Sequence, residues 1–176
     1  MRTGHCGAQS LLLSSQRLHE ISLACARRLS TFNVIDDFNR QRVHIEVEPS
    51  INAARLVRLF AQITRDHGLA KGIRTNNGLA FLGEVFQQWS KDNGVDLQPI
   101  QPGKPNQNAF IEPFNRTFRA DVLDQHLFAK LEEVREITHG WMIDDNESRP
   151  DDGLNGATPY EYRYSSAESS PFDLST

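Results

Sequence analysis

The chain has 176 residues, of which 38% are hydrophobic and 24% are charged, and this composition predicts one soluble globular domain. Its formal net charge of −4 excludes nucleic-acid binding by overall charge, so any such contact must come from a local basic patch. No run of residues approaches the ~18 apolar residues of a membrane span, which predicts no membrane contact. The two cysteines, Cys6 and Cys25, form no pattern typical of a disulfide or a zinc site, so we expect a cytoplasmic location.

The two ends of the chain differ in amino-acid composition from the rest. In residues 1–30 arginine and serine are frequent and Glu20 is the only acid, which superficially suits an organelle transit peptide. The apolar positions of this segment give neither a clean helical stripe nor a strand pattern, so we expect a divergent, poorly ordered segment over 1–30. The Ser-rich residues 164–176 have little to bury and predict a disordered tail.

The first regular elements are predicted to be a hairpin and a helix. Residues 32–35 are an apolar run typical of a buried strand, and residues 42–47 alternate polar and apolar side chains as a half-buried strand does. The sequence DDFNRQ between them indicates a turn, so the two strands should pair antiparallel. We expect Ser50 to cap a helix that ends near His67, because apolar residues recur at helical spacing and Gly68 follows.

Strands and helices alternate along the rest of the domain. We expect strands at 72–75 and 95–100, with Pro99 at a sheet edge, and long helices at 81–93 and 129–143. A short helix should begin at Thr158-Pro159, since proline suits the first helical position. The order of elements predicts an α/β fold in which helices cover a sheet. The apolar faces of the two long helices are expected to be Phe81, Val85 and Trp89 in the first, and Leu131, Val134, Ile137 and Trp141 in the second.

One acid lies among apolar neighbours in the stretch IQPGKPNQNAFIEPFNRTFR, residues 100–119. This acid, Glu112, is near the start of a predicted helix, where the helix dipole favours a carboxylate, and that structural role is the simplest interpretation. Pro113 is tolerated if the helix begins near Phe110 to Glu112, and costs about 3 kcal/mol if it begins near Asn106. The alternative interpretation is that Glu112 belongs to a metal site.

The metal-site interpretation depends on a second stretch, IRTNNGLAF at residues 73–81, which is a strand-to-loop junction. Thirty-five residues (77–111) separate its Asn76 from Glu112. Sites in α/β folds form where strand ends meet loops, and Asn76 and the loop before Glu112 both lie at such ends.

Three blocks of the sequence resemble the catalytic core of insertion-sequence transposases of the OrfB type, which are relatives of retroviral integrases. They are residues 73–81, residues 100–119 and NESRPDDGLNGATPYEYR at 146–163, and VIDDFNRQ at 34–41 resembles the family's second core strand and its turn. The resemblance covers roughly Ala24 to Arg163. It implies an RNase H-like fold, with a mixed central sheet flanked by helices, and an integrase-type catalytic core over residues 31–163.

The family's chemistry is metal-dependent cleavage and transfer of DNA strands, in which three carboxylates hold two Mg²⁺ ions about 4 Å apart. By the resemblance, Glu112 is the third of these acids. Asn76 stands where the family has the second, an Asp, and an amide oxygen brings no negative charge. The first acid should lie on the first strand, before Asp36, and it is absent, because no Asp precedes Asp36 in the sequence. We therefore expect the Mg²⁺ site of the family not to form and the chain not to cut or join DNA.

The resemblance also suggests which residues contact DNA, the family's partner. Basic and amide side chains near the expected site could bind phosphates, although scattered basic residues are more often plain solvated surface. We assign Asp36 and Asp37 to the turn of the hairpin rather than to metal binding. The candidate nucleic-acid-binding residues are Arg74, Lys104, Asn108, Arg116 and Arg119.

Two classes of function remain open from the sequence. The first is the transposase core of a mobile element, acting in its family on transposon ends and target DNA, here with a degenerate active site. The second is a non-catalytic module that keeps the fold and binds nucleic acid, a second copy of itself or a full-length transposase.

Overall fold

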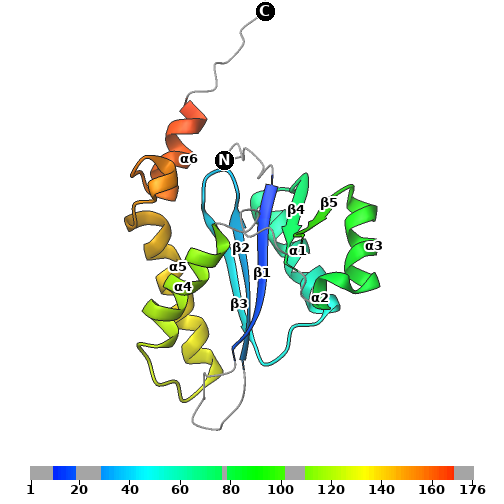
Figure 1. The fold of residues 1–176 in the computed structure, drawn as a ribbon, viewed down its shortest axis with the longest axis horizontal. Coiled ribbons are helices and arrows are strands. Elements are labelled where there is room, and N and C mark those ends of the chain that lie inside the picture. Colours follow the sequence, from blue (N-terminus) through cyan, green and yellow to red (C-terminus); the bar gives the residue numbers. More distant parts are fainter. Residues whose placement is uncertain (1–9, 19–28, 77–78, 102–109, 169–176) are drawn as a thin grey trace, which may run out of the picture.

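The computed structural model describes residues 10–18, 29–76, 79–101 and 110–168. Five strands form one mixed sheet in the order β3-β2-β1-β4-β5 (Figure 1). β1 pairs antiparallel with β2, which pairs antiparallel with β3, while β4 and β5 run parallel to β1. The strands are β1 Ser10–Leu18, β2 Leu29–Asp36, β3 Arg42–Glu48, β4 Gly72–Thr75 and β5 Asp96–Pro99.

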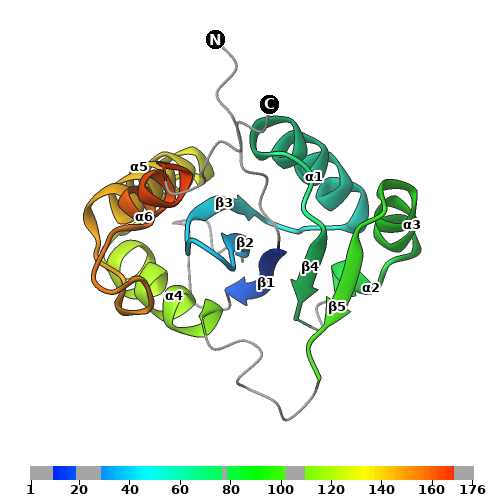
Figure 2. The ribbon, with the colours of Figure 1, turned by 90° about the horizontal axis from the view of Figure 1, so that it is seen from above.

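Helices cover both faces of the sheet, as the α/β prediction requires (Figure 2). On one face lie α1 Ala53–His67, α2 Leu79–Leu82 and α3 Glu84–Asn93, and on the other lie α4 Ile111–Phe118, α5 Leu131–Ser148 and α6 Pro159–Glu168. A π-helical turn, η2 Arg119–Leu123, continues α4, and a short 3₁₀ turn, η3 Asp152–Leu154, precedes α6.

Each face of the sheet has its own hydrophobic core. The first core packs Phe32 and Val34 of β2 and Ile73 of β4 against Phe60 of α1 and Phe86 of α3. The second core is built from the opposite face of β2 and β3 and from the inward sides of α4, η2 and α5. Its buried members are Leu29, Ile35, Val47, Ile111, Phe114, Phe118, Val122, Leu123, Phe128 and Val134. This second core holds α4, and with it Glu112, against the sheet.

Strand β1 is a correction to the sequence interpretation, which expected no regular structure in residues 1–30. β1 is the central strand, paired with β2 on one side and with β4 on the other. A strand that helices cover on both faces needs no polar–apolar alternation and reads as a continuous apolar run. The run Leu11 to Leu13 is that signal, and Leu11 is only 2% exposed.

Several local signals in the hairpin and around the helices are confirmed. The turn between β2 and β3 falls at residues 37–39, inside the predicted DDFNRQ stretch. Gly68 and Gly94 end α1 and α3, each with a positive φ. β5 lies at the edge of the sheet, and Pro99 is its last residue. The apolar face predicted for α5 packs into the second core, although the helix itself runs on to Ser148.

The beginning of α1 and the phase of the next helix were predicted wrongly. Asn52, not Ser50, caps α1, and its side chain accepts a hydrogen bond from the Arg55 backbone N–H at 2.9 Å. The helix expected over 81–93 is divided at Gly83 into α2 and α3. Val85 is therefore 55% exposed, while Phe86 is fully buried against Phe60.

The C-terminal helix is longer than predicted. α6 begins at Pro159 as expected and continues through Glu168, so the first part of the predicted tail, residues 164–168, is helical. Residues 169–176 lie outside the described part of the chain. Thr158 explains the start of this helix, because its backbone N–H and hydroxyl exchange hydrogen bonds with Glu161.

Candidate functional site

Asn76 follows the last residue of β4 directly, at the carboxyl end of that strand, and is half-buried. β4 is parallel to β1, with Leu13 in register with Thr75. Ser14 and Asn76 directly follow these two aligned residues. β1 has the sequence SLLLSSQRL and contains no carboxylate. The strand that should hold the first acid of the family is therefore present in the fold, but without an acid.

Glu112 is the second residue of α4 and is exposed. Because α4 begins at Ile111, Pro113 occupies its first turn, where a missing N–H leaves no intrahelical bond unmade. The late start of the helix, one of the two alternatives for Pro113, is thus confirmed. Ile111, Phe114 and Phe118 form the buried side of α4. Because that side is buried, the other side of α4, which includes Glu112, faces solvent.

The aspartates of the β2–β3 turn serve that turn, as predicted. The Oδ1 atom of Asp36 accepts a hydrogen bond from the Phe38 backbone N–H at 2.9 Å, and burial raises the pKa of Asp36. Asp37 pairs with Arg40 at 3.0 Å and with Arg74 at 3.7 Å. The carboxylate of Asp37 therefore neutralises part of the charge that Arg74 could offer to a phosphate.

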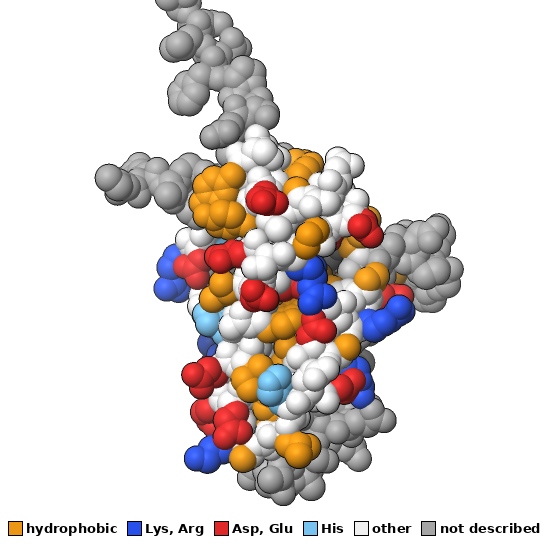
Figure 3. All heavy atoms as spheres, turned by 90° about the vertical axis from the view of Figure 1, so that its left-hand side faces the viewer, with side chains coloured by type: hydrophobic (Ala, Val, Ile, Leu, Met, Phe, Trp, Pro, Cys, Tyr) orange, Lys and Arg blue, Asp and Glu red, His pale blue; other side chains and the backbone are white. Residues whose placement is uncertain are grey.

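The predicted DNA contacts are divided between described and undescribed residues. Arg116 is exposed on α4, and Arg119 begins η2 with its Nε 3.5 Å from Asp124. Lys104 and Asn108 lie outside the described residues. On the side of the molecule formed by α4, α5 and α6, acidic and basic side chains are interspersed rather than gathered into one basic surface (Figure 3).

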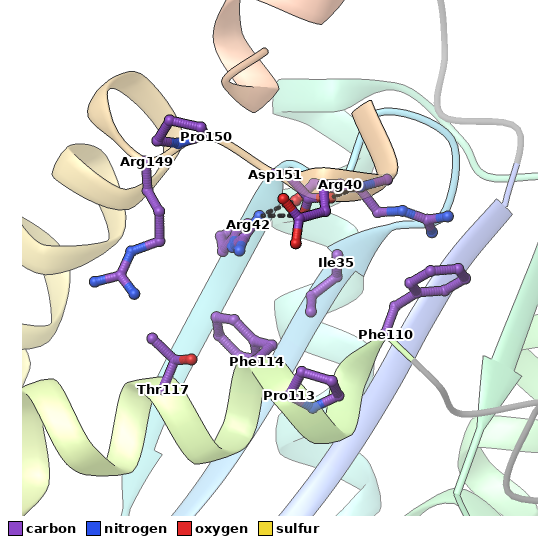
Figure 4. A pocket seen from close by; sticks show the side chains of 12 residues that line it. Ile35, Arg40, Arg42, Phe110, Pro113, Phe114, Thr117, Arg149, Pro150 and Asp151 are labelled. Atoms are coloured by element: carbon purple, nitrogen blue, oxygen red, sulfur yellow. Dashed lines mark hydrogen bonds and ion pairs between the residues drawn. The ribbon is translucent and has the colours of Figure 1, made fainter. Parts of the chain in front are cut away.

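A pocket of about 430 Å³ lies beside the start of α4, between the β2–β3 hairpin and the loop after α5 (Figure 4). Phe110 and Pro113, which flank Glu112 in sequence, line one wall. The Arg40 guanidinium carbon lies 3.3 Å from the centroid of the Phe110 ring, a close cation–π contact. The remaining lining residues are Ile35, Arg42, Phe114, Thr117, Arg149, Pro150, Asp151, Asp152 and Gly153.

The three arginines of this pocket were not predicted as a group, and each has an acidic partner. Arg42 Nε lies 2.5 Å from the buried Asp145 carboxylate, which also pairs with Arg149 at 2.8 Å. Arg40 pairs with Asp37. No local pattern could have found this group, because its members come from the hairpin and from the loop after α5. Their charges are largely compensated within the fold, so the pocket is not a strongly cationic site.

The residues present do not fit the two-metal centre that is typical of the family named in the sequence resemblance. Among the described residues no three His, Cys, Asp or Glu side chains gather in a group that could hold a metal ion. Asn76 and Glu112 supply one carboxylate between them, and β1 supplies none. A centre of this kind depends on several negatively charged oxygen ligands to offset clustered cations.

In the described part of the chain, no helix is long and apolar enough to cross a membrane.

Comparison with known proteins finds relatives among mobile elements. Residues 93–159 match the family model described as "Integrase core domain". The chain is 38% identical over 141 residues to a 31.7 kDa protein of insertion element IS407 from Burkholderia multivorans, covering 80% of this chain and 51% of the relative. It is 36% identical to a 39.2 kDa protein of insertion element IS476 from Xanthomonas euvesicatoria, covering 80% of this chain and 41% of that protein. The chain thus spans about half the length of these relatives.

Solved structures with the same fold are retroviral integrases. The catalytic core domain of BIV integrase superposes with a TM-score of 0.68 at 14% identity, covering 92% of this chain and 97% of that core. The HTLV-2 integrase catalytic core domain in complex with magnesium also gives a TM-score of 0.68 at 14% identity, over 91% and 99% of the two chains. A chain of the simian T-cell lymphotropic virus intasome in complex with PP2A regulatory subunit B56 gamma gives a TM-score of 0.71 at 12% identity, covering 100% of this chain and 59% of that chain.

The two kinds of comparison agree with the fold and with the sequence blocks. The solved structures establish an RNase H-like fold, in which a mixed sheet is flanked by helices. The insertion-element relatives and the integrase core model support an integrase-like core of the insertion-element type. Proteins of this type act on DNA, and divalent metal ions are typical of them. In sequence and in fold the chain is similar to the integrase-like cores of insertion-element proteins.

Proposed function

We propose that this chain is the transposase core of a mobile element that keeps the fold for DNA binding but has lost metal-dependent strand cleavage and transfer. One observation carries the proposal. Three acids are expected on β1, after β4 and on the first turn of α4, and of these segments only α4 has its carboxylate, Glu112.

The charge balance explains why the site is expected to fail. Two divalent cations bring four positive charges into one small volume, and three carboxylates together with the substrate phosphate offset them. Here one carboxylate remains. The Asn76 amide can offer an oxygen, but it cannot offset charge. Mg²⁺ also gives up its bound water reluctantly, so a site with a single negative ligand has little to hold it.

The proposal is tested by metal titration and by plasmid nicking with the full chain. The unmodified protein is expected to show no saturable binding of Mn²⁺ in calorimetry and no Mg²⁺- or Mn²⁺-dependent nicking of supercoiled plasmid. The variant Ser14→Asp/Asn76→Asp adds two carboxylates, one on β1 and one directly after β4, and it is expected to bind Mn²⁺. The control Ser30→Asp/Asn93→Asp adds the same charge away from the site and should not.

Two outcomes would contradict the proposal. Nicking by the unmodified chain that disappears on Glu112→Gln would show that the site is active as it stands. A restored variant that binds no more Mn²⁺ than the control, although it folds, would show that these positions do not form one site.

DNA binding is the activity that this proposal retains, and the exposed Arg116 on α4 favours it. Binding to a labelled duplex is expected to weaken steeply as salt increases, because phosphate contacts release counterions. Absence of binding even at low salt would exclude DNA as the partner. The remaining candidate partners would then be a second copy of the chain or a full-length transposase.

A further inference from the structure

A buried hydrogen bond ties α4 to the middle of the sheet. The Asn33 Nδ2 atom on β2 donates to the Asn115 Oδ1 atom on α4 at 2.6 Å, across 82 residues of sequence. Asn33 is fully buried, and Asn115 is only 6% exposed. Both lie among the apolar side chains that hold α4 against the sheet. Two amides in such surroundings need a reason, since apolar side chains of similar size would pack there without a cost in desolvation.

The location of this bond supplies the reason. Asn115 follows Glu112 by three residues, which is about 4.5 Å along the helix axis and less than one turn. Asn33 is directly across from Ser14 in the β1–β2 register, and Ser14 is the position beside Asn76. The bond therefore joins the helix that carries Glu112 to the part of the sheet where the two strand positions of the site lie.

The apolar contacts of α4 cannot perform this task alone. Ile111, Phe114 and Phe118 hold the helix onto the sheet, but hydrophobic contact is not directional and tolerates small sliding and rotation. A short side-chain hydrogen bond depends on both distance and angle, so it selects one height and one rotation of the helix. We propose that Asn33 is a positioning residue, which sets the placement of Glu112 relative to the end of β4 by fixing α4 through Asn115.

The effect of Asn33 on the metal site rests on the proposed function. Its effect on the position of α4 does not, and the distance experiment needs neither metal nor DNA. Spin labels are placed at Lys71→Cys, directly before β4, and at Arg116→Cys on α4, in a background with Cys6→Ser and Cys25→Ser. Both labelled positions are exposed. Pulsed electron–electron resonance should give one narrow distance distribution for this labelled protein.

Two variants at the bond separate position from stability. Asn33→Leu is expected to lower the melting temperature and to broaden or shift the distance distribution, because the Asn115 amide loses this donor. Asn33→Leu/Asn115→Leu removes both polar groups, and its melting temperature should return close to that of the labelled parent. Its distance distribution should stay broad or shifted, because no directional contact has been restored.

The control removes a buried polar atom elsewhere. Thr138 on α5 is 2% exposed, and its hydroxyl has no hydrogen-bond partner among the described residues. Thr138→Val should leave the distance distribution unchanged. A distribution in the double leucine variant as narrow as in the parent, and at the same distance, would overturn the positioning role, whatever happens to stability.

A metal readout connects the Asn33–Asn115 hydrogen bond to the site. In the Ser14→Asp/Asn76→Asp background, adding Asn33→Leu/Asn115→Leu is expected to weaken Mn²⁺ binding at least about 10-fold, the size of effect seen when supporting contacts of metal ligands are removed. Unchanged Mn²⁺ affinity would refute the consequence for Glu112. Failure of the background variant itself to bind Mn²⁺ would count against the proposed function, and the distance experiment would still decide the positioning role.

Discussion

Arg42 on β3 and Asp145 on α5 form a buried ion pair, with 2.5 Å between Nε and Oδ2 and the Asp145 side chain 1% exposed. The neighbouring Asn146 binds the backbone of Arg42. Its side chain accepts a hydrogen bond from the Arg42 N–H at 2.7 Å and donates one to the Arg42 carbonyl at 3.0 Å. The C-terminal part of α5 is thereby fastened to the beginning of β3. Arg42 also lines the pocket beside α4.

Removing Arg42 should be strongly destabilising. Arg42→Met leaves the Asp145 carboxylate buried with Arg149 as its remaining cation, and we expect a loss of about 3 kcal/mol in the free energy of unfolding. Urea denaturation of the variant and the parent measures it. The matched control is Arg58→Met on the exposed side of α1, which should change stability by less than about 0.5 kcal/mol. Equal effects of the two substitutions would contradict a role for the ion pair.

Because of Glu46, the free energy of unfolding should decrease as the pH falls into the acid range. Burial by itself would raise the pKa of Glu46, but hydrogen bonds from His44 at 3.0 Å and Arg55 at 2.9 Å outweigh it and lower the pKa from 4.5 to about 2. A lowered folded-state pKa stabilises the protein above the unfolded value, and that stabilisation is lost as pH falls from about 4.5 to 2. We expect about 3 kcal/mol to be lost over this range.

The pH dependence is checked by denaturation at pH values from 2 to 7. Glu46→Gln removes the titrating group, so its stability should change less over this range than that of the parent. Glu84→Gln on α3, an exposed position, should keep the slope of the parent. A parent and a Glu46→Gln variant with the same acid dependence would show that Glu46 is not responsible.

Phe118 should be a major contributor to the core under α4. It is 2% exposed and lies 5.3 Å from Trp141 and 6.3 Å from Phe114 between ring centroids. Phe118→Ala is expected to cost about 3–5 kcal/mol, because the cavity cannot collapse between a helix and a sheet. Phe38→Ala, at a position 59% exposed, should cost less than about 1 kcal/mol. Thermal or urea unfolding compares them, and a Phe118→Ala cost as small as that of Phe38→Ala would refute the assignment.

Two glycines in different backbone conformations should respond oppositely to alanine. Gly94 ends α3 with φ of +67°, a left-handed conformation that costs a side chain about 1–2 kcal/mol, so Gly94→Ala should destabilise. Gly140 lies within α5, and an added Cβ would meet nothing within 4 Å. Gly140→Ala should therefore stabilise by about 0.5–1 kcal/mol. Melting curves of both variants test the pair, and shifts in the same direction would contradict it.

Arg116 and Arg119 should contribute to DNA binding without sequence preference. Arg116→Gln/Arg119→Gln is expected to weaken duplex binding and to reduce the slope of log affinity against log salt by about 1 for each phosphate that is no longer neutralised. Arg65→Gln, near the end of α1 on the opposite face of the sheet, should leave the slope unchanged. Fluorescence anisotropy at several salt concentrations gives both slopes. A slope that none of the substitutions alters would assign the phosphate contacts to other residues.

Local signals predicted where α1 and α3 end, but not which side of α3 is buried. Gly68 and Gly94 end their helices because the chain needs a positive φ at those points, which is a property of the residue itself. The inward face of α3 was predicted wrongly at Val85 because the break at Gly83 changes the phase of the helix. The packing of Phe86 against Phe60 then decides which side is buried. β1 was missed because a central strand lacks alternation, and only its pairing with β2 and β4 identifies it.

The chemistry available at the candidate site follows from the amino-acid sequence alone. The sequence places an amide at Asn76 and a carboxylate at Glu112 and has no aspartate before Asp36, and no folding can alter that inventory. Which positions become neighbours depends instead on the folded chain. The register of β1 with β4 aligns Leu13 with Thr75, the residues directly before Ser14 and Asn76, and the Asn33–Asn115 hydrogen bond connects β2 to α4 across 82 residues. Contacts over such separations follow from strand pairing and packing, which local propensities do not encode.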